Sequence, residues 1–392
     1  MSDFERMRPY QDEEVPAVVA RLVRNEALRR GVAALVFPRL ARTLPSLAQA
    51  LTGTLLRWRG RRIGSVLDFQ MQMGRYIDLV LRTRITSLSY SGLERVPRDR
   101  ACLFISNHRD IVYDSGIINR LLYEIGQPTC RLAIGDNLFT ADYAADIMRL
   151  NKGFMIERTL VGRKAQYAAM QRTARYVRSS LEEGEHVWIA QRAGRAKDGL
   201  DRTEPALLKM LGLAFRKETE DFQEIAARLQ IIPTAISYEL DPTDLRKARE
   251  LELLARNGTF EKSSDDDLAA IAEGLTGFKG RMHVHFGTLA TADTSAPVSA
   301  EALAEAIDRE IVGHLQLYPT HAHAAQQLDI PVPGPVAADD GRALPLLTQR
   351  LADCDAAQRP YLLAQYGNLA RNKAQLDAVY DVPPAQVLTA AL

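Results

Sequence analysis

The sequence lacks the features that mark secreted and membrane-spanning proteins. No run of about 18 apolar residues occurs in the chain, so we expect no transmembrane helix. Residues 1–6 (MSDFER) have neither a basic n-region nor an apolar h-region, so we expect no secretory signal. The cysteines Cys102, Cys130 and Cys354 are odd in number and far apart. This spacing excludes a disulfide framework and favours a reducing compartment.

The composition is that of an ordinary globular protein. Of the 392 residues, 46% are hydrophobic and 25% are charged, which suits a chain that buries a substantial core. The length allows one large domain with additions, or two domains.

Charge is distributed unevenly, and the strongest asymmetry lies near the N-terminus. Between Arg21 and Arg62 the sequence has ten arginines, one acid (Glu26) and no lysine, so this segment carries +9 while the whole chain carries +1. Apolar residues such as Leu35 and Trp58 lie between the arginines. The pattern is typical of a surface that binds anionic membranes, where each basic residue contributes about 1 kcal/mol. The protein is therefore expected to be cytoplasmic and peripheral on the inner face of the cell membrane.

Two other interpretations of this basic segment stay open. It can be a solvated helix pair packed on the main domain, or a nucleic-acid surface. Because no nucleic-acid motif accompanies the charge, we expect no nucleic-acid partner.

Periodicity divides the chain into three predicted domains. Residues 1–80 form a basic, helical N-terminal region, with breaks at Pro38 and Pro45. In residues 81–295, strands alternate with helices, which predicts an α/β sheet with covered faces. Residues 296–392 form a helical C-terminal extension that contains a proline-rich linker, residues 331–335.

The first segment with side chains suited to catalysis is residues 106–114 (SNHRDIVYD), which directly follows the apolar run 101–105. Open α/β sheets build their sites where strands end, and His108 follows such a strand. A carboxylate near an imidazole fixes its tautomer, so that the ring can take a proton from a hydroxyl. The candidates for that carboxylate are Asp110 and Asp114. The segment predicts a group-transfer enzyme with His108 as its base.

Three later segments follow in order. They are residues 153–158 (GFMIER), residues 194–199 (GRAKDG) and residues 231–236 (IIPTAI). Together with His108 and Asp114, these blocks resemble the glycerophosphate and lysophospholipid acyltransferase family, over roughly residues 83 to 290. Each block alone is weak, but their order and spacing together are fairly specific.

This resemblance implies a fold and an activity. The fold is a glycerol-3-phosphate acyltransferase-like mixed sheet flanked by helices, with helical additions at both ends. The activity is transfer of a fatty acyl group from acyl-CoA or acyl carrier protein to a hydroxyl of a glycerol-3-phosphate or lysophosphatidate-type acceptor, in phospholipid synthesis. His108 would be the general base, and an aspartate would orient it. No cofactor beyond the thioester co-substrate is expected.

The predicted substrate-binding residues come from the second and third blocks. A phosphorylated acceptor needs fixed guanidinium groups, because the arginine fork matches phosphate oxygens in a bidentate manner. Arg158 and Arg195 match the family's positions, and Arg192 adds a third positive charge. Gly153 and Gly194 are the glycines of the two blocks.

The sequence departs from the family pattern at two points. The family's aspartate follows its histidine by five residues, where this chain has Tyr113. We therefore favour Asp114, which lies at a predicted helix start and can cap it, with Asp110 as the alternative. The family also has a glutamate before its Gly-Arg step, whereas this chain has Gln191-Arg192-Ala193. An amine, a sugar lipid or another alcohol is the alternative acceptor, and a non-catalytic membrane-surface protein is the alternative function.

No metal site is expected. His283 and His285 alternate along a predicted strand and so share one face, but no cysteine or acid lies at ligand spacing from them in the sequence. We interpret them as a satisfied polar face of the strand.

Overall fold

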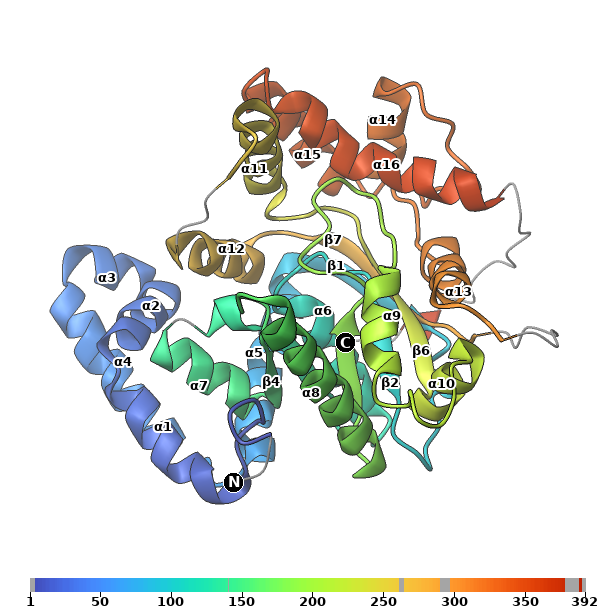
Figure 1. Ribbon diagram of the computed structural model, residues 1–392. Coiled ribbons are helices and arrows are strands. Elements are labelled where there is room, and N and C mark those ends of the chain that lie inside the picture. The colour runs from blue at the N-terminus through green and yellow to red at the C-terminus, as the bar shows by residue number, and fades with distance from the viewer. Residues whose placement is uncertain (1–3, 140, 261–263, 290–296, 378–387, 390–392) are drawn as a thin grey trace. The chain divides into compact units, whose positions relative to one another are not determined.

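The computed structural model describes residues 4–139, 141–260, 264–289, 297–377 and 388–389, and it has a mixed α/β architecture (Figure 1). The chain forms two compact units: residues 1–76 with 131–169, and residues 77–130 with 170–392. This division reflects compactness, so the domain boundaries predicted at 80/81 and 295/296 stay predictions.

The first unit is mainly helical. Its helices α3 and α4 begin at Pro38 and Pro45, where the sequence predicted breaks, because proline is favoured in the first turn of a helix. Its core joins apolar side chains of α1 to Phe69 and Leu150. The strands β3 and β4 form a parallel pair. The elements of this unit are α1 (Val15–Arg24), α2 (Glu26–Val36), α3 (Pro38–Thr43), α4 (Pro45–Gly60), β3 (Arg131–Gly135), α7 (Asp142–Leu150) and β4 (Gly153–Ile156), with the short 3-10 helices η1 (Asp12–Glu14) and η3 (Asp136–Leu138).

Two long helices connect the units, because each begins in the first unit and ends in the second. They are α5 (Val66–Arg84) and α8 (Arg163–Glu182).

The second unit is built on a sheet with the strand order β5-β2-β6-β7-β1-β8. Strands β5, β2 and β6 are parallel, as are β7 and β1, whereas β6 pairs with β7 and β1 with β8 in antiparallel fashion. The mixed sheet predicted from the sequence is confirmed. Every residue of β2 and β6 is buried, which explains their near-continuous apolar sequences. The strands are β1 (Ile85–Ser91), β2 (Leu103–Ser106), β5 (Val187–Ala190), β6 (Ile231–Tyr238), β7 (Gly280–Phe286) and β8 (Leu388–Thr389).

Helices flank this sheet, as the sequence predicted. Helix α13 packs against β6 and contacts α9 and α10, and Figure 1 shows α9 beside that strand. Helices α11 and α14–α16 enclose a second core around Leu347, Leu362 and Tyr366. The helices of this unit are α6 (Tyr113–Glu124), α9 (Pro205–Gly212), α10 (Phe222–Leu229), α11 (Asp244–Asn257), α12 (Ser264–Thr276), α13 (Ala300–Gly313), α14 (Pro319–Gln327), α15 (Ala343–Asp353) and α16 (Arg359–Asp377), with the 3-10 helix η2 (Leu93–Arg95).

None of the helices in the described part of the chain has a stretch that is both long and apolar enough to cross a membrane. Cys102, Cys130 and Cys354 are all free thiols.

Candidate active site

The turn that carries His108 is fixed to the sheet by the side chain of Asn107. Its Nδ2 donates to the carbonyl oxygen of Ile236 at 2.9 Å, and its Oδ1 accepts from the Ile236 amide at 2.8 Å. The side chain of Asn107 thus extends the pairing of β2 with β6 by hydrogen bonds to the β6 backbone, although β2 itself ends at Ser106. This arrangement places His108 at the C-terminal edge of the parallel strands, where the sequence predicted a site.

His108 is held by a carboxylate and by an aromatic ring. Its Nδ1 lies 2.7 Å from Oδ2 of Asp114, and the edge of its ring meets Trp188 with ring centroids 5.5 Å apart. Because Nδ1 faces a carboxylate, Nδ1 carries the proton of the neutral ring and Nε2 carries the lone pair. The side chain is 15% exposed, so a reactant can reach it. The pair is therefore suited to accept a proton from a hydroxyl group.

Asp114 is completely buried and accepts four hydrogen bonds. Besides His108, its Oδ2 accepts from the amides of Arg109 (2.6 Å) and Asp110 (3.0 Å), and its Oδ1 accepts from the Tyr238 hydroxyl (2.6 Å). Burial, together with the charges of Asp114 and Asp110, holds the pKa of Tyr238 well above its ordinary value, so this hydroxyl stays a donor. These donors compensate the buried charge of Asp114, and sequence reasoning missed Tyr238 among them.

Asp110 has a different position from Asp114. Its Oδ1 accepts from the amides of Val112 and Tyr113, both at 2.9 Å, so Asp110 caps the start of α6. The expectation that Asp114 caps this helix is wrong: Asp114 lies within the first turn and accepts from amides that precede the helix. Oδ2 of Asp110 lies 3.8 Å from Nζ of the buried Lys279. The carboxylate at His108 is therefore that of Asp114, while the catalytic role of either aspartate stays a prediction.

The third sequence block lies directly beside His108. The amide of Ala196 donates to the carbonyl oxygen of His108 at 2.7 Å. Gly194 has φ +76°, a left-handed conformation that glycine adopts readily. Arg192 forms an ion pair of 3.1 Å with Asp198 of the same block, so part of its charge is compensated. The structure thus brings the block to His108, and the Arg195 guanidinium forms no ion pair with any residue that the structure describes.

Arg195 lines a cavity of about 140 Å³ in the second unit. Arg246 and Arg249 of α11 line it as well, facing Glu250 and Asp266. Three guanidinium groups and two carboxylates leave one net positive charge at the walls. Such a cavity is chemically suited to an anionic group such as a phosphate.

The second block belongs to the first unit, and its predicted glycine has a clear packing role. A Cβ at Gly153 would lie 2.6 Å from the carbonyl oxygen of Met148, so only glycine fits between β4 and α7. Arg158 is exposed, and its amide donates to Oδ2 of Asp136 at 3.1 Å. The substrate-binding roles of Gly153 and Arg158 stay predictions.

A buried network of charges behind His108 was not predicted. Lys247 of α11 is 1% exposed, and its Nζ donates to the carbonyl oxygen of Arg109 at 2.8 Å and to the Asp241 carboxylate. The Arg109 guanidinium in turn pairs with the buried Asp201. The residue after His108 is therefore fixed through both its backbone and its side chain.

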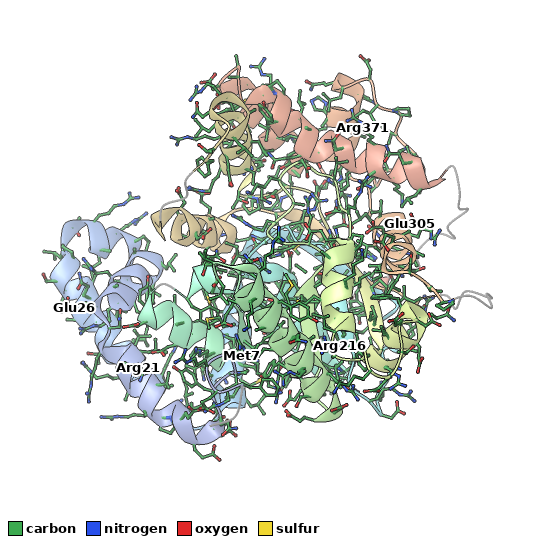
Figure 2. All side chains as sticks on the ribbon, viewed as in Figure 1. Met7, Arg21, Glu26, Arg216, Glu305 and Arg371 are labelled. Atoms are coloured by element: carbon green, nitrogen blue, oxygen red, sulfur yellow. The ribbon has the colours of Figure 1, made fainter. Side chains whose placement is uncertain are left out.

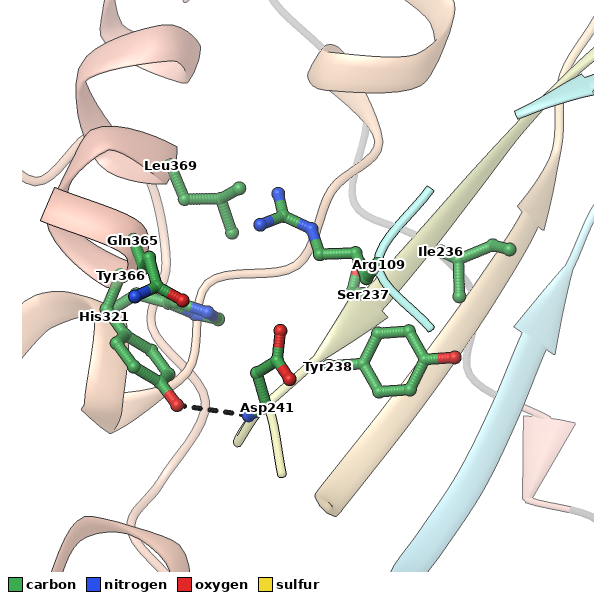
Figure 3. A pocket seen from close by; sticks show the side chains of 9 residues that line it. All are labelled: Arg109, Ile236, Ser237, Tyr238, Asp241, His321, Gln365, Tyr366 and Leu369. Carbon is green, nitrogen blue, oxygen red and sulfur yellow. Dashed lines mark hydrogen bonds between the residues drawn. The ribbon is translucent and has the colours of Figure 1, made fainter. Parts of the chain in front are cut away.

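The C-terminal helices extend this network. The Tyr366 hydroxyl of α16 accepts from the Asp241 amide at 3.0 Å (Figure 3). The same hydroxyl donates to Asp244 at 2.6 Å. The cavity between these residues and Arg109 measures about 20 Å³, which has room for a water molecule but not for a substrate. This small cavity lies among the residues that hold the His108 turn in place, and no sequence pattern predicts it.

Comparison with known proteins associates the central part of the chain with one family. Residues 87–237 match the family model described as Acyltransferase. No curated protein matches the chain. Among solved structures, the chain is similar to the 1-acyl-sn-glycerophosphate (LPA) acyltransferase PlsC from Thermotoga maritima, with 14% identity, a TM-score of 0.36, and coverage of 73% of this chain and 94% of that one. It is also similar to chloroplast FtsY from Physcomitrella patens, with 13% identity, a TM-score of 0.22, and coverage of 78% and 95%. At these TM-scores neither likeness carries an argument.

Proposed function

From the match of residues 87–237 to the acyltransferase family model, we propose that the chain transfers a fatty acyl group from an acyl thioester to a hydroxyl of a glycerol-3-phosphate or lysophosphatidate-type acceptor. The observation that carries this proposal is the Asp114–His108 pair at the sheet edge, with a bond of 2.7 Å. The donor is acyl-CoA or acyl carrier protein, and no other cofactor takes part.

In the proposed reaction, Nε2 of His108 removes the proton of the acceptor hydroxyl. The oxygen attacks the thioester carbonyl, the tetrahedral intermediate collapses with cleavage of the C–S bond, and the thiolate takes the proton back from His108. Asp114 keeps the imidazole in the productive tautomer and stabilises the imidazolium that forms. Contributions of this kind are worth about 10²- to 10⁴-fold in rate.

Arg195 and its cavity support a phosphorylated acceptor. The cavity is lined by Arg195, which belongs to the block that bonds to His108, and by Arg249, and their guanidinium groups are suited to bind phosphate oxygens, whereas Arg246 is already paired with Glu273 and Asp266. Arg192 and Gly194, of the same block as Arg195, belong to this proposed acceptor site, and acceptor binding by Gly153 and Arg158 of the first unit stays a prediction.

Gln191 is the observation that favours a different acceptor. It stands where the family has a glutamate, and it is 1% exposed. Both polar atoms of its amide are without a hydrogen-bond partner in the described part of the chain. A neutral amide can both donate and accept, so the second candidate function is transfer to an amine, a sugar lipid or another alcohol.

The first unit supports contact with a membrane surface. Its helices expose large apolar side chains, with Trp58 52% exposed, among many exposed arginines. Arg21 of α1, labelled in Figure 2, is exposed too, but its charge is paired with Asp146 at 2.7 Å. Between Arg21 and Arg62, the other exposed large apolar side chains are Leu35, Val36, Leu44, Leu47 and Leu51. We propose a peripheral position on the inner face of the cell membrane, in phospholipid synthesis.

The experiment is product analysis by mass spectrometry. Purified protein is incubated with acyl-CoA or acyl carrier protein and, in parallel, with phosphorylated and phosphate-free acceptors. An acylated phosphorylated product is expected. Preference for a phosphate-free acceptor would favour the second candidate. Failure with every acceptor and both donors, together with binding to anionic liposomes, would instead leave a non-catalytic membrane-surface protein.

A further inference from the structure

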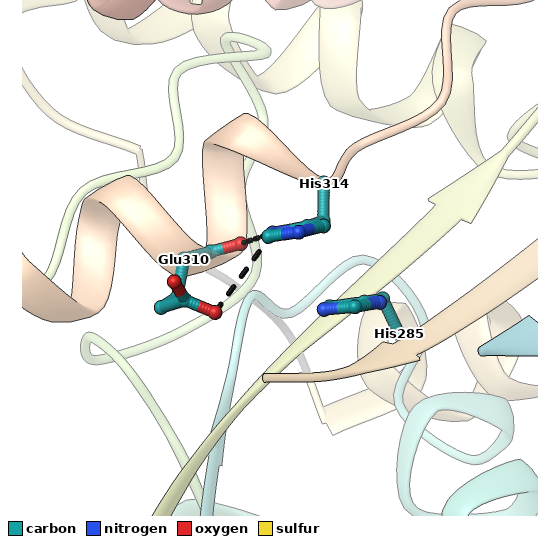
Figure 4. Close-up of side chains that lie close together, drawn as sticks. All are labelled: His285, Glu310 and His314. Carbon is teal, nitrogen blue, oxygen red and sulfur yellow. Dashed lines mark hydrogen bonds and ion pairs between the residues drawn. The ribbon is translucent and has the colours of Figure 1, made fainter. Parts of the chain in front are cut away.

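Three potential metal ligands meet on the sheet of the second unit, away from His108. His285 lies on β7, Glu310 on α13, and His314 directly follows α13 (Figure 4). One potential ligand atom from each lies within 4.8 Å of the others. His285 pairs with Ala235, and because side chains alternate along a strand these two lie on the opposite face of the sheet from Tyr238, whose hydroxyl bonds to Asp114. The cluster is therefore separate from the acyl-transfer site.

A chain of hydrogen bonds links His285 to the carbonyl oxygen of Met282. We assign its protons from that end: Ser89 Oγ donates to the carbonyl oxygen at 3.4 Å and so accepts from Nδ1 of His283 at 2.8 Å. Nε2 of His283 then accepts from Ser91 Oγ at 3.0 Å, and Ser91 Oγ accepts from Nδ1 of His285 at 2.8 Å. The direction of every proton follows from the carbonyl at the end, which can only accept. Nε2 of His285 is therefore left with a lone pair.

That lone pair has no donor. His285 is 4% exposed, and its Nε2 has no hydrogen-bond partner among the residues that the structure describes. A buried, unpaired acceptor is costly unless a ligand satisfies it.

Glu310 and His314 face the same position. Oε2 of Glu310 accepts from the Thr288 amide at 3.2 Å and lies 3.9 Å from Nδ1 of His314. Nδ1 of His314 donates to the Glu310 carbonyl oxygen at 2.8 Å, which leaves the lone pair of this ring on Nε2. The His285 and His314 rings are stacked, with centroids 3.7 Å apart. Stacked rings direct their lone pairs in parallel, so the partly exposed His314 must rotate to share an ion with His285.

We propose that His285, Glu310 and His314 bind one divalent transition metal ion of the zinc class. Two imidazoles and one carboxylate are a donor set that zinc takes, and the partial exposure of Glu310 and His314 leaves a position for water. Ser91 and His283 would orient His285 as outer-shell partners. The ion would link β7 to α13, and so stabilise the sheet against its covering helix.

The sequence predicted no metal site because no acid lies at ligand spacing from His283 or His285 along the chain. The fold supplies that acid from α13. Glu310 is 25 residues from His285 in the sequence, and the two come together only in the folded chain.

The test is metal uptake by the full-length protein, stripped with a chelator and then dialysed against Co²⁺ or Zn²⁺. We expect one ion per chain by elemental analysis, d–d absorption of nitrogen-coordinated Co²⁺, and a higher Tm with metal. His314→Ala should abolish uptake; it removes a partly exposed ring and so should leave the fold intact. Ser91→Ala should weaken binding by about 10- to 100-fold.

Two control variants make the result specific. His323→Ala removes another histidine that lies near the surface of α14, and it should bind metal as the parent does. His108→Ala should also bind normally, so failure of the acyl-transfer proposal would not affect this one. The proposal is overturned if the parent takes up no stoichiometric metal, or if uptake persists in both His314→Ala and Glu310→Gln.

Discussion

The comparison of Asp114→Asn with Asp110→Asn tests which carboxylate acts on His108. At position 114 the new amide can keep its oxygen where Oδ2 accepts from His108 and from two backbone amides, while its nitrogen meets the Tyr238 hydroxyl. That hydroxyl can rotate to accept. The fold is therefore expected to persist, with a loss of about 1–3 kcal/mol in the free energy of unfolding.

The rate should respond far more strongly than the stability. Without the carboxylate, no negative charge stabilises the imidazolium of His108, and kcat should fall by about 10²- to 10⁴-fold. Asp110→Asn should change kcat by less than about tenfold, because asparagine caps a helix as well as aspartate does. Its main loss is the weak contact with Lys279 at 3.8 Å.

The assay is release of free thiol from acyl-CoA in the presence of the acceptor, with circular dichroism to verify folding. The reasoning is refuted if Asp110→Asn loses the larger part of the rate while Asp114→Asn keeps it. Equal losses of kcat in both variants, with intact folds, would also contradict the geometry, since of these two carboxylates it is that of Asp114 that hydrogen-bonds the imidazole.

Three further predictions concern the surroundings of the site. Arg195→Ala should raise the KM for a phosphorylated acceptor by about tenfold or more at nearly constant kcat, measured by initial rates; an unchanged KM would remove Arg195 from the acceptor site. Lys247→Met should lower the free energy of unfolding by about 3–5 kcal/mol in urea titrations, since it leaves the Asp241 carboxylate, only 15% exposed, without its cation, and a change below about 1 kcal/mol would argue against that account. Burial, with a smaller contribution from the Arg109 charge, lowers the pKa of His321 to about 3. Between about pH 6 and pH 4 the imidazole therefore takes up a proton when the protein unfolds. The free energy of unfolding should then fall by about 1.4 kcal/mol for each pH unit that the pH is lowered. His321→Asn should flatten this slope by that amount while His323→Asn should not, and equal slopes in all three proteins would contradict it.

The sequence predicted those elements of the fold whose structure is determined by residues close together along the chain. The fully buried β2 and β6 have near-continuous apolar sequences, and Pro38 and Pro45 begin new helices because proline suits the first turn. The His108–Asp114 contact was also predictable, since a turn of six residues brings the second side chain back to the first.

What the sequence could not predict depends on packing between distant segments. Lys247 lies in a helix rich in charged residues, which is typical of a solvated face, yet tertiary packing buries it against the His108 turn. Tyr238 is the last residue of an apolar strand, and its hydroxyl contacts Asp114 only because β6 lies next to β2. Glu310 meets His285 through packing of α13 on the sheet. None of these contacts has a local signature.

The most direct test of the account is acyl transfer by His108→Ala. The variant is incubated with acyl-CoA and a lysophosphatidate acceptor, its product is quantified by mass spectrometry, and its fold is compared with the parent by circular dichroism and Tm. We expect a folded protein whose product formation falls by about 10²-fold or more, while His323→Ala matches the parent. A folded His108→Ala protein that transfers the acyl group at the parent rate would contradict the central claim.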